Sequence, residues 1–201
     1  MSNELLHEEI ESLKMLLDHA GYDYHDGAEE DVLTGLKPLN IPEIYTEFLQ
    51  ELDPGNSLWR IGPQLKVKLH PSDELPEWQS DREREDQLAF GTLNNQALIL
   101  ESGNGEDEEM GPPVYRLDAD GEKQCISSSF IQFLKILRAG MDMLSQVDDF
   151  EEEEDEEEES YDDFNDYGET TFEGGRQDLL NGYLDEIEHI DPDCATAWVL
   201  T

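Results

Sequence analysis

The sequence predicts an α+β fold, and two observations carry this prediction. Apolar residues recur at helical spacing near the N-terminus and again in residues 130–144, whereas the middle of the chain holds short apolar or alternating runs separated by turn residues. Helices at the ends with strands between them are typical of an α+β domain. The 201 residues suffice for one domain with tails or for two small domains, and they can bury a core.

A first helix is predicted over residues 3–20. Ser2 and Asn3 both suit the N-cap position, and the helix is expected to end at Ala20 and Gly21. Its apolar stripe consists of Leu6, Ile10, Leu13 and Leu17, widened by Leu5 and Leu16. The stretch that follows, residues 21–31, is expected to be a loop.

A second helix is predicted at Pro42, because the proline ring suits the first helical position. The turn residues 53–56 are expected to end it, and two short strands follow in residues 57–61 and 65–69. The apolar face of this helix comprises Ile44, Tyr45, Phe48, Leu49 and Leu52. We expect the interior to be filled by Tyr45, Phe48, Leu49 and Trp59.

The centre of the chain predicts a β-hairpin. A polar stretch, residues 70–86, comes first and holds Trp78 without a predicted element. Two apolar runs, residues 87–93 and 96–102, then flank the pair Asn94-Asn95, a residue type that tolerates the backbone of a tight turn. The sequence therefore predicts two antiparallel strands joined at these asparagines.

The closing part of the domain predicts two further strands and a helix. Residues 112–118 and the run that begins at Cys125 are the strands, and one of the serines 127–129 is expected to cap the helix. The apolar face of that helix comprises Phe130, Phe133, Leu134, Leu137 and Met141. These serines have no glycine elbow and no evident base beside them, so we interpret them as caps rather than nucleophiles.

The composition changes abruptly at residue 148. Residues 148–173 contain 16 acidic residues and no basic one, and such a block is expected to be disordered because its charges repel and little can be buried. It is either a solvated tail that aids solubility or an anionic mimic that competes for a basic cleft. The last segment has helical spacing at Leu179, Leu180, Tyr183, Leu184 and Ile187, and it either packs on the domain or acts as a tethered binding segment. The predicted divisions are residues 1–27, 28–147, 148–173 and 174–201.

The charge restricts the kinds of partner. The chain has 52 acidic and 12 basic residues, a net charge of −40, and residues 1–147 alone carry −19. Nucleic acids and anionic membranes would be repelled, whereas a basic protein would be attracted and steered. Two distant cysteines, Cys125 and Cys194, give no disulfide framework and no metal spacing. With an acidic N-terminus and no apolar run long enough for a membrane span, we expect a cytoplasmic protein.

No catalytic, cofactor-binding or metal-binding residue is predicted. None of the five histidines lies at metal-ligand spacing from another, and no glycine-rich phosphate loop occurs. The stretch from Asp163 to Gly174 resembles a calcium loop at some positions, but its twelfth residue is glycine where a bidentate glutamate is required. The 52 carboxylates make chance acid pairs inevitable, so no single pair indicates glycoside hydrolysis.

Three stretches together resemble a known family. These are GLKPLNIPEIYTEFLQELDPGNSLWRI, QLAFGTLNNQALILES and PPVYRLDADGEKQCISSSFIQFLKIL. They resemble the opening helix, the central hairpin and the closing strand, turn and helix of the SUKH superfamily, over roughly residues 28–140. The resemblance implies a central, mostly antiparallel sheet of about four to six strands with helices packed on one side. The acidic segment and the terminal segment lie outside the family pattern.

The family includes bacterial immunity proteins and the yeast cell-wall assembly regulator. The resemblance therefore implies a non-enzymatic protein that neutralises a cognate toxin, and the charge suggests a basic, nuclease-type toxin domain. The alternative is an intracellular regulatory or scaffold module whose acidic tail recruits partners. Two kinds of residue are the predicted partner contacts, one aromatic and the others acidic: Trp78; Glu106, Asp107, Glu108 and Glu109; and Glu151, Glu152, Glu153, Glu154, Asp155, Glu156, Glu157, Glu158 and Glu159.

Overall fold

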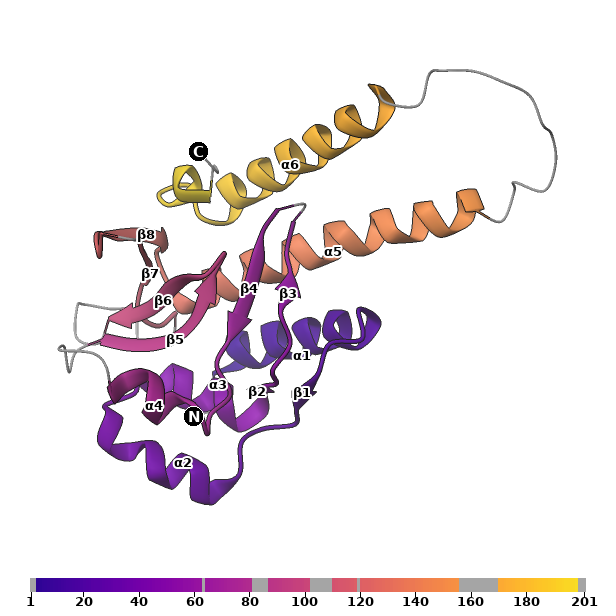
Figure 1. The fold of residues 1–201 in the computed structure, drawn as a ribbon. Helices are drawn as coiled ribbons and strands as arrows, with labels where there is room; N and C mark the ends of the chain where they lie inside the picture. Colours follow the sequence, from indigo (N-terminus) through magenta and orange to yellow (C-terminus); the bar gives the residue numbers. More distant parts are fainter. Residues whose placement is uncertain are drawn as a thin grey trace.

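A computed structural model describes residues 3–62, 64–80, 87–101, 110–118, 120–155 and 170–198. It confirms the α+β class, because a six-stranded antiparallel sheet has helices packed against it, and a separate two-stranded sheet accompanies it (Figure 1). The larger sheet has the order β3-β4-β5-β6-β7-β8, so each strand pairs with its neighbour in sequence. Such a meander needs only short connections.

The first helix forms where the sequence predicts it. Helix α1 (Glu4–His19) begins after Asn3, whose Oδ1 accepts a hydrogen bond from the backbone N–H of Leu6 at 3.2 Å. The predicted stripe Leu6, Ile10, Leu13 and Leu17 is buried. An N-cap bond of this kind satisfies one of the amide groups that have no partner within the helix, so Asn3 rather than Ser2 is the cap.

Residues 21–54 contain elements that the sequence did not predict. Strand β1 (Tyr24–His25) pairs with β2 (Asp53–Pro54), in residues expected to be a loop and a turn. Helix α2 (Glu30–Leu36) continues into the short 3-10 helix η1 (Lys37–Leu39). Only Leu36 of α2 is buried, so the helix has no apolar stripe by which it could be recognised.

Helix α3 (Glu43–Glu51) is the predicted proline-opened helix, with Pro42 one position earlier than expected, at the N-cap. The strands β3 (Trp59–Arg60) and β4 (Lys66–Leu69) follow as predicted. The hairpin of β5 (Gln87–Leu93) and β6 (Gln96–Glu101) is confirmed. Asn94 and Asn95 both have positive φ, 49° and 67°, which suits the tight turn of a two-residue hairpin.

The sheet ends with β7 (Val114–Leu117) and β8 (Lys123–Ser127). Helix α5 (Phe130–Asp155) then begins at the predicted serine cap, since Ser129 Oγ accepts from the backbone N–H of Gln132 at 3.2 Å. The helix continues past residue 144 and past the predicted domain end at 147. Gly140 lies within this helix, and a Cβ there would lie 2.2 Å from the carbonyl oxygen of Ile61, so glycine allows a close approach to the loop after β3.

The centre of the core is a cluster of aromatic rings from three elements. Tyr45 and Phe48 of α3, Phe90 of β5, and Phe130 and Phe133 of α5 are fully buried, with ring centroids between 5.4 and 6.4 Å apart in each contacting pair. Trp59 and Leu49 are buried as well, so the predicted interior residues are confirmed. Helices α3 and α5 are thus fixed to the same face of the sheet.

The C-terminal segment packs on the domain. Helix α6 (Thr170–Ile190) lies alongside α5, and the 3-10 helix η2 (Ala195–Trp198) reaches β8 (Figure 1). The hydroxyl of Tyr183 donates to the carbonyl oxygen of Ile136 at 3.3 Å, and Trp198 Nε1 donates to that of Ile126 at 2.7 Å. Of the two open interpretations, packing back therefore holds.

One hydrophobic core joins segments that the sequence divided. Buried residues of α1, of the sheet and of α6 belong to one contiguous cluster, so the predicted boundaries after residues 27 and 173 do not separate cores. Helices occupy both ends of segment 148–173, which was expected to be disordered: α5 runs to Asp155, and α6 starts at Thr170. Residues 156–169 lie outside the described part of the chain. No helix in the described residues combines the length and apolarity that a membrane crossing requires.

Candidate protein-interaction surface

Trp78 is the predicted contact residue that the structure places most informatively. It lies on the short helix α4 (Leu75–Ser80), within the stretch for which no element was predicted. Its side chain is 44% exposed, and its ring stacks on the imidazole of His70 with centroids 4.0 Å apart and planes 14° from parallel. The buried His70 therefore supports one face of the indole ring while much of the side chain remains open to solvent.

Helix α4 is fastened to the sheet on both sides of Trp78. Leu75 is fully buried, and Gln79 Nε2 donates to the carbonyl oxygen of Ala89 in β5 at 3.3 Å. The backbone N–H of Trp78 donates to the carbonyl oxygen of Glu74 at 3.3 Å. An exposed tryptophan held in one orientation loses little conformational entropy when a partner covers it, which is the property of a binding hot spot.

An acidic hollow of about 500 Å³ begins at the residues just before α4. Three segments line it: the β1–β2 sheet, the start of α2, and residues 71–74 between β4 and α4. Its titratable lining residues are four carboxylates and one histidine: Glu29, Asp53, Asp73, Glu74 and His25. No lysine or arginine is among the described residues that line it, so the hollow offers a site for a cation.

Asp53 gives the hollow its shape. It is buried, and its two carboxylate oxygens accept hydrogen bonds from the backbone N–H and the hydroxyl of Ser72, at 2.8 and 2.7 Å. These bonds hold the segment before α4 against strand β2. Gly27, which also lines the hollow, has φ +90°, and a Cβ there would lie 2.2 Å from the carbonyl oxygen of Gln50, so only glycine fits.

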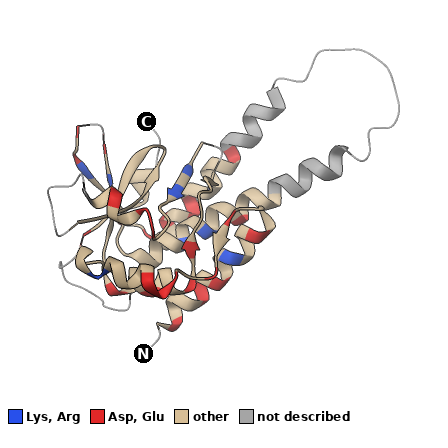
Figure 2. Cartoon of the chain, turned by 60° about the horizontal axis from the view of Figure 1, so that its bottom comes forward, with Lys and Arg blue, Asp and Glu red and all other residues tan. Residues whose placement is uncertain are grey.

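The helical side of the molecule is acidic too. Helices α1, α2 and α3 together carry ten Asp or Glu and a single lysine, Lys14. Figure 2 shows acidic residues spread over the helices on the side that comes forward, with Lys and Arg fewer among them. The start of α2 also lines the hollow, so the negative charge of these helices adds to that of its own carboxylates and extends the reach of its attraction for cations.

The remaining predicted contacts cannot be placed as side chains. Glu106, Asp107, Glu108 and Glu109, together with Glu156, Glu157, Glu158 and Glu159, lie outside the described residues. Glu151, Glu152, Glu153, Glu154 and Asp155 belong to the last turns of α5, where only the backbone is described. Their part in binding stays a prediction.

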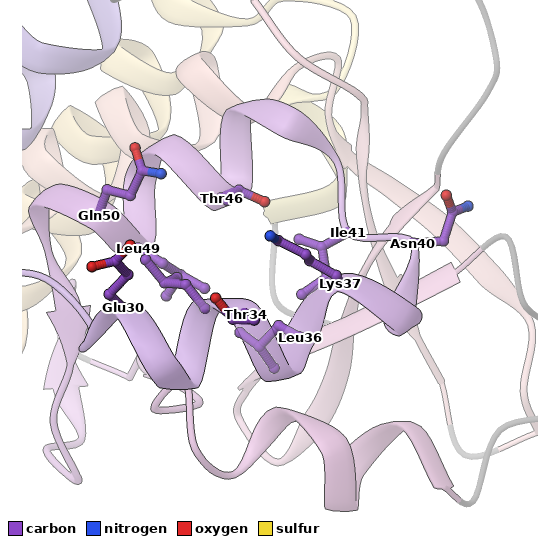
Figure 3. Close-up of a pocket in the computed structure, with 10 residues that line it drawn as sticks. Glu30, Thr34, Leu36, Lys37, Asn40, Ile41, Thr46, Leu49 and Gln50 are labelled. Carbon is purple, nitrogen blue, oxygen red and sulfur yellow. The ribbon is translucent and has the colours of Figure 1, made fainter.

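A second hollow, of about 420 Å³, separates α2 and η1 from α3 (Figure 3). Lys37 extends along it, while Glu30 and Gln50 lie toward one end and Asn40 toward the other. The hydroxyl of Thr46 is directed to the carbonyl oxygen of Pro42 at 3.4 Å, a contact within its own helix. Its lining mixes one carboxylate and one amine with uncharged groups, so it lacks the single charge sign of the acidic hollow.

The serines 127–129 form a junction between β8, α5 and the C-terminal segment. Ser129 caps α5, while Asp191, from the C-terminal segment, accepts from Ser127 Oγ at 3.0 Å and from the backbone N–H of Ser128 at 2.6 Å. Asp191 is buried and is 64 residues from Ser127, so no local sequence pattern could have revealed the contact.

Sequence analysis also did not predict a contact of His7. His7 of α1 lies 2.7 Å from Glu51 at the end of α3, and Glu11 completes the one group of three potential metal ligands among the described residues. The hydrogen bond to Glu51, followed by its charge, raises the pKa of His7 above its ordinary value of 6.5. All three side chains are at least partly exposed, and the His7–Glu51 ion pair links two helices that the chain separates by 44 residues.

Comparison with known proteins adds no assignment. No protein-family model matches the chain, and no curated protein matches it. The candidate site is therefore argued from the geometry above.

Proposed function

We propose that this protein is a non-enzymatic binding protein that docks a basic protein partner on the surface formed by α4 and the acidic hollow. The observation that carries the proposal is the position of Trp78, half exposed and supported by His70, one helical turn after Glu74, which is one of the four carboxylates that line the hollow. The aromatic ring offers apolar area, and the carboxylates offer charge complementarity.

The two parts of the surface have different roles in this proposal. Carboxylates at and around the hollow attract a cationic domain over long range and raise its association rate. Trp78 then slows dissociation, because an aromatic anchor covered by a partner contributes most when water is excluded from it. Lys or Arg side chains of the partner would enter the hollow beside Glu29, Asp73 and Glu74.

The resemblance to the SUKH superfamily supports a more specific proposal. Under it, the protein is a cytoplasmic immunity protein, and the partner is a toxin domain whose basic cleft binds nucleic acid. The fold is compatible with that resemblance in its order of helix, antiparallel strands and serine-capped helix. Blocking would be both steric and electrostatic, since a negative surface competes with phosphates for the same cleft.

A second candidate function is that of a regulatory or scaffold module. The packing of the C-terminal segment supports this candidate. The acidic stretch between α5 and α6 is joined at both ends to the folded part, because α6 and η2 pack on α5 and β8. The helices on both sides of this stretch thus belong to the folded part, and a partner could bind the stretch without touching Trp78. Substitution of Trp78 separates the two candidates.

The test begins with the full chain, affinity-tagged and expressed in its source cell, and partners identified by mass spectrometry at low and high salt. We expect a basic protein whose recovery falls with salt and with Trp78→Ala. Purified, that partner should damage cells or nucleic acid, and co-expression of the native chain should restore growth. A partner that is anionic, or growth that Trp78→Ala restores as well as the native chain does, would contradict the proposal.

A further inference from the structure

The fold brings the only two cysteines of the chain together. Cys125 lies in β8 and Cys194 lies between α6 and η2, and their Sγ atoms are 3.2 Å apart although the residues are separated by 69 positions. Sequence analysis found neither a disulfide framework nor a metal spacing in these two distant cysteines. Because a disulfide bond is about 2.05 Å long, the sulfurs need to approach by only about 1.2 Å to bond.

The contacts around the two thiols hold them in place from both sides. Asp191 bonds to the end of β8 through Ser127 and Ser128, and Trp198 bonds to the carbonyl oxygen of Ile126. Asp191 and Trp198 are each 1% exposed and flank Cys194 in sequence. The segment that carries Cys194 is therefore anchored before and after the thiol, and its position opposite Cys125 is a consequence of packing.

We propose that Cys125 and Cys194 form a reversible disulfide that fastens the C-terminal segment to the edge of the sheet. Two thiols lose two electrons and two protons, and a small disulfide such as oxidised glutathione accepts them and leaves as two thiols. The inference is independent of the proposed partner, because it concerns only contacts within the chain.

The geometry also assigns the order of the two exchange steps. Cys125 is partly exposed, whereas Cys194 is buried, and this burial, with the neighbouring Cys125 thiol adding to it, raises the pKa of Cys194 well above its ordinary value. The thiolate is the attacking species, so Cys125 attacks the small disulfide first and releases one thiol. Cys194 then attacks the Cys125 sulfur of the mixed disulfide and releases the second.

The disulfide would lie at one edge of the six-stranded sheet. Strand β8 is an end strand of the six-stranded sheet, and η2 packs beside it through Trp198. Closing the disulfide would enclose α5, the acidic stretch and α6 in one covalent loop. In the reduced chain, hydrogen bonds and apolar contacts alone hold this segment; in the oxidised chain, it cannot separate from the sheet edge.

The experiment equilibrates the purified full chain with reduced and oxidised glutathione over a series of ratios, then alkylates free thiols and measures intact mass. The same series is run in urea. Folding that aligns the thiols must favour the disulfide, and we expect the equilibrium constant for the intramolecular bond to be roughly 30- to 1000-fold higher in the native than in the unfolded chain. The melting temperature of the oxidised chain should be roughly 5–10 °C higher than that of the reduced chain.

Single variants test the order of attack and supply controls. Cys194→Ser should take up glutathione at Cys125 faster than Cys125→Ser takes it up at Cys194, and neither variant should show the oxidant-dependent rise in melting temperature. A native-to-urea ratio near one, thiols that remain alkylatable at every ratio, or bonds only between chains would overturn the disulfide. Equal uptake by the two variants would overturn the assigned order.

Discussion

Two aromatic regions of this molecule differ in what supports them. In the core, Phe130 contacts four other rings, each fully buried, contributed by α3, β5 and α5 itself. At the surface, Trp78 on a six-residue helix stacks on one ring among the described residues, that of His70, and keeps 44% of its area exposed. The first arrangement determines the fold. The surface arrangement holds the Trp78 ring in one orientation and leaves much of it exposed, so this aromatic side chain is available to bind a partner.

The largest expected effect separates these regions through stability. Phe130→Ala removes the ring that joins α5 to Tyr45, Phe48 and Phe90, and it should lower the free energy of unfolding by about 3–5 kcal/mol. Urea denaturation followed by circular dichroism measures this. Tyr45→Phe is the matched control: the Tyr45 hydroxyl is buried with no hydrogen-bond partner among the described residues, so its removal should cost little or stabilise. A loss below about 1 kcal/mol for Phe130→Ala would contradict the core assignment.

The next effect concerns the attachment of the C-terminal segment. Asp191→Ala removes the acceptor for Ser127 and for the backbone N–H of Ser128, and should destabilise by about 2–3 kcal/mol, with faster proteolysis in α6. Asp193→Ala provides the control, because Asp193 is exposed, and it should change stability by less than about 0.5 kcal/mol. Equal effects of the two substitutions would show that Asp191 does not hold the segment.

Trp78→Ala sharpens the comparison, because stability and binding should respond differently. We expect a stability loss of only about 1 kcal/mol, since the ring is partly exposed and packs on one neighbour. Dissociation of the partner should be roughly 30-fold faster, as for an aromatic hot spot. Chemical denaturation measures the stability loss, and binding kinetics on an immobilised partner measure the dissociation rate. A large stability loss with an unchanged dissociation rate would show that Trp78 serves the fold rather than binding.

The smallest effect is a pH dependence at the surface. Because the contact with Glu51 raises the folded pKa of His7 above 6.5, its stabilisation should be complete below pH 6.5 and disappear as pH rises through the folded pKa. The melting temperature of the native chain should therefore exceed that of His7→Gln at pH 5.5, and the two should converge above neutral pH. A difference that grows with pH would contradict the ion pair.

The sequence predicted the parts of the fold that follow a local pattern. The stripe of α1, the Asn94-Asn95 turn and the Ser129 cap depend on residues close together in sequence. Helix α2 was missed because Leu36 is its only buried residue, and helix α4 because it lies in a polar stretch.

The candidate site was only partly predictable for the same reason. Trp78 could be singled out as an aromatic residue in polar surroundings, but nothing local indicated that His70 would support it. The hollow depends on the pairing of β1 with β2, which brings Glu29 near Asp73 and Glu74 from distant parts of the chain. The approach of Cys125 to Cys194 likewise depends on the packing of α6 on α5 and of η2 on β8.

The most direct test of the central claim is the association rate with the identified partner, measured by stopped-flow over a range of salt concentrations. The test variant replaces three carboxylates of the hollow, Glu29→Gln, Asp73→Asn and Glu74→Gln; the control makes an equal charge change at exposed positions of α6, Asp185→Asn, Glu186→Gln and Glu188→Gln. We predict association about 10-fold slower at low salt and a flatter salt dependence for the hollow variant, with a much smaller change for the control. Unchanged rates, or an equal loss in both variants, would contradict docking at the hollow.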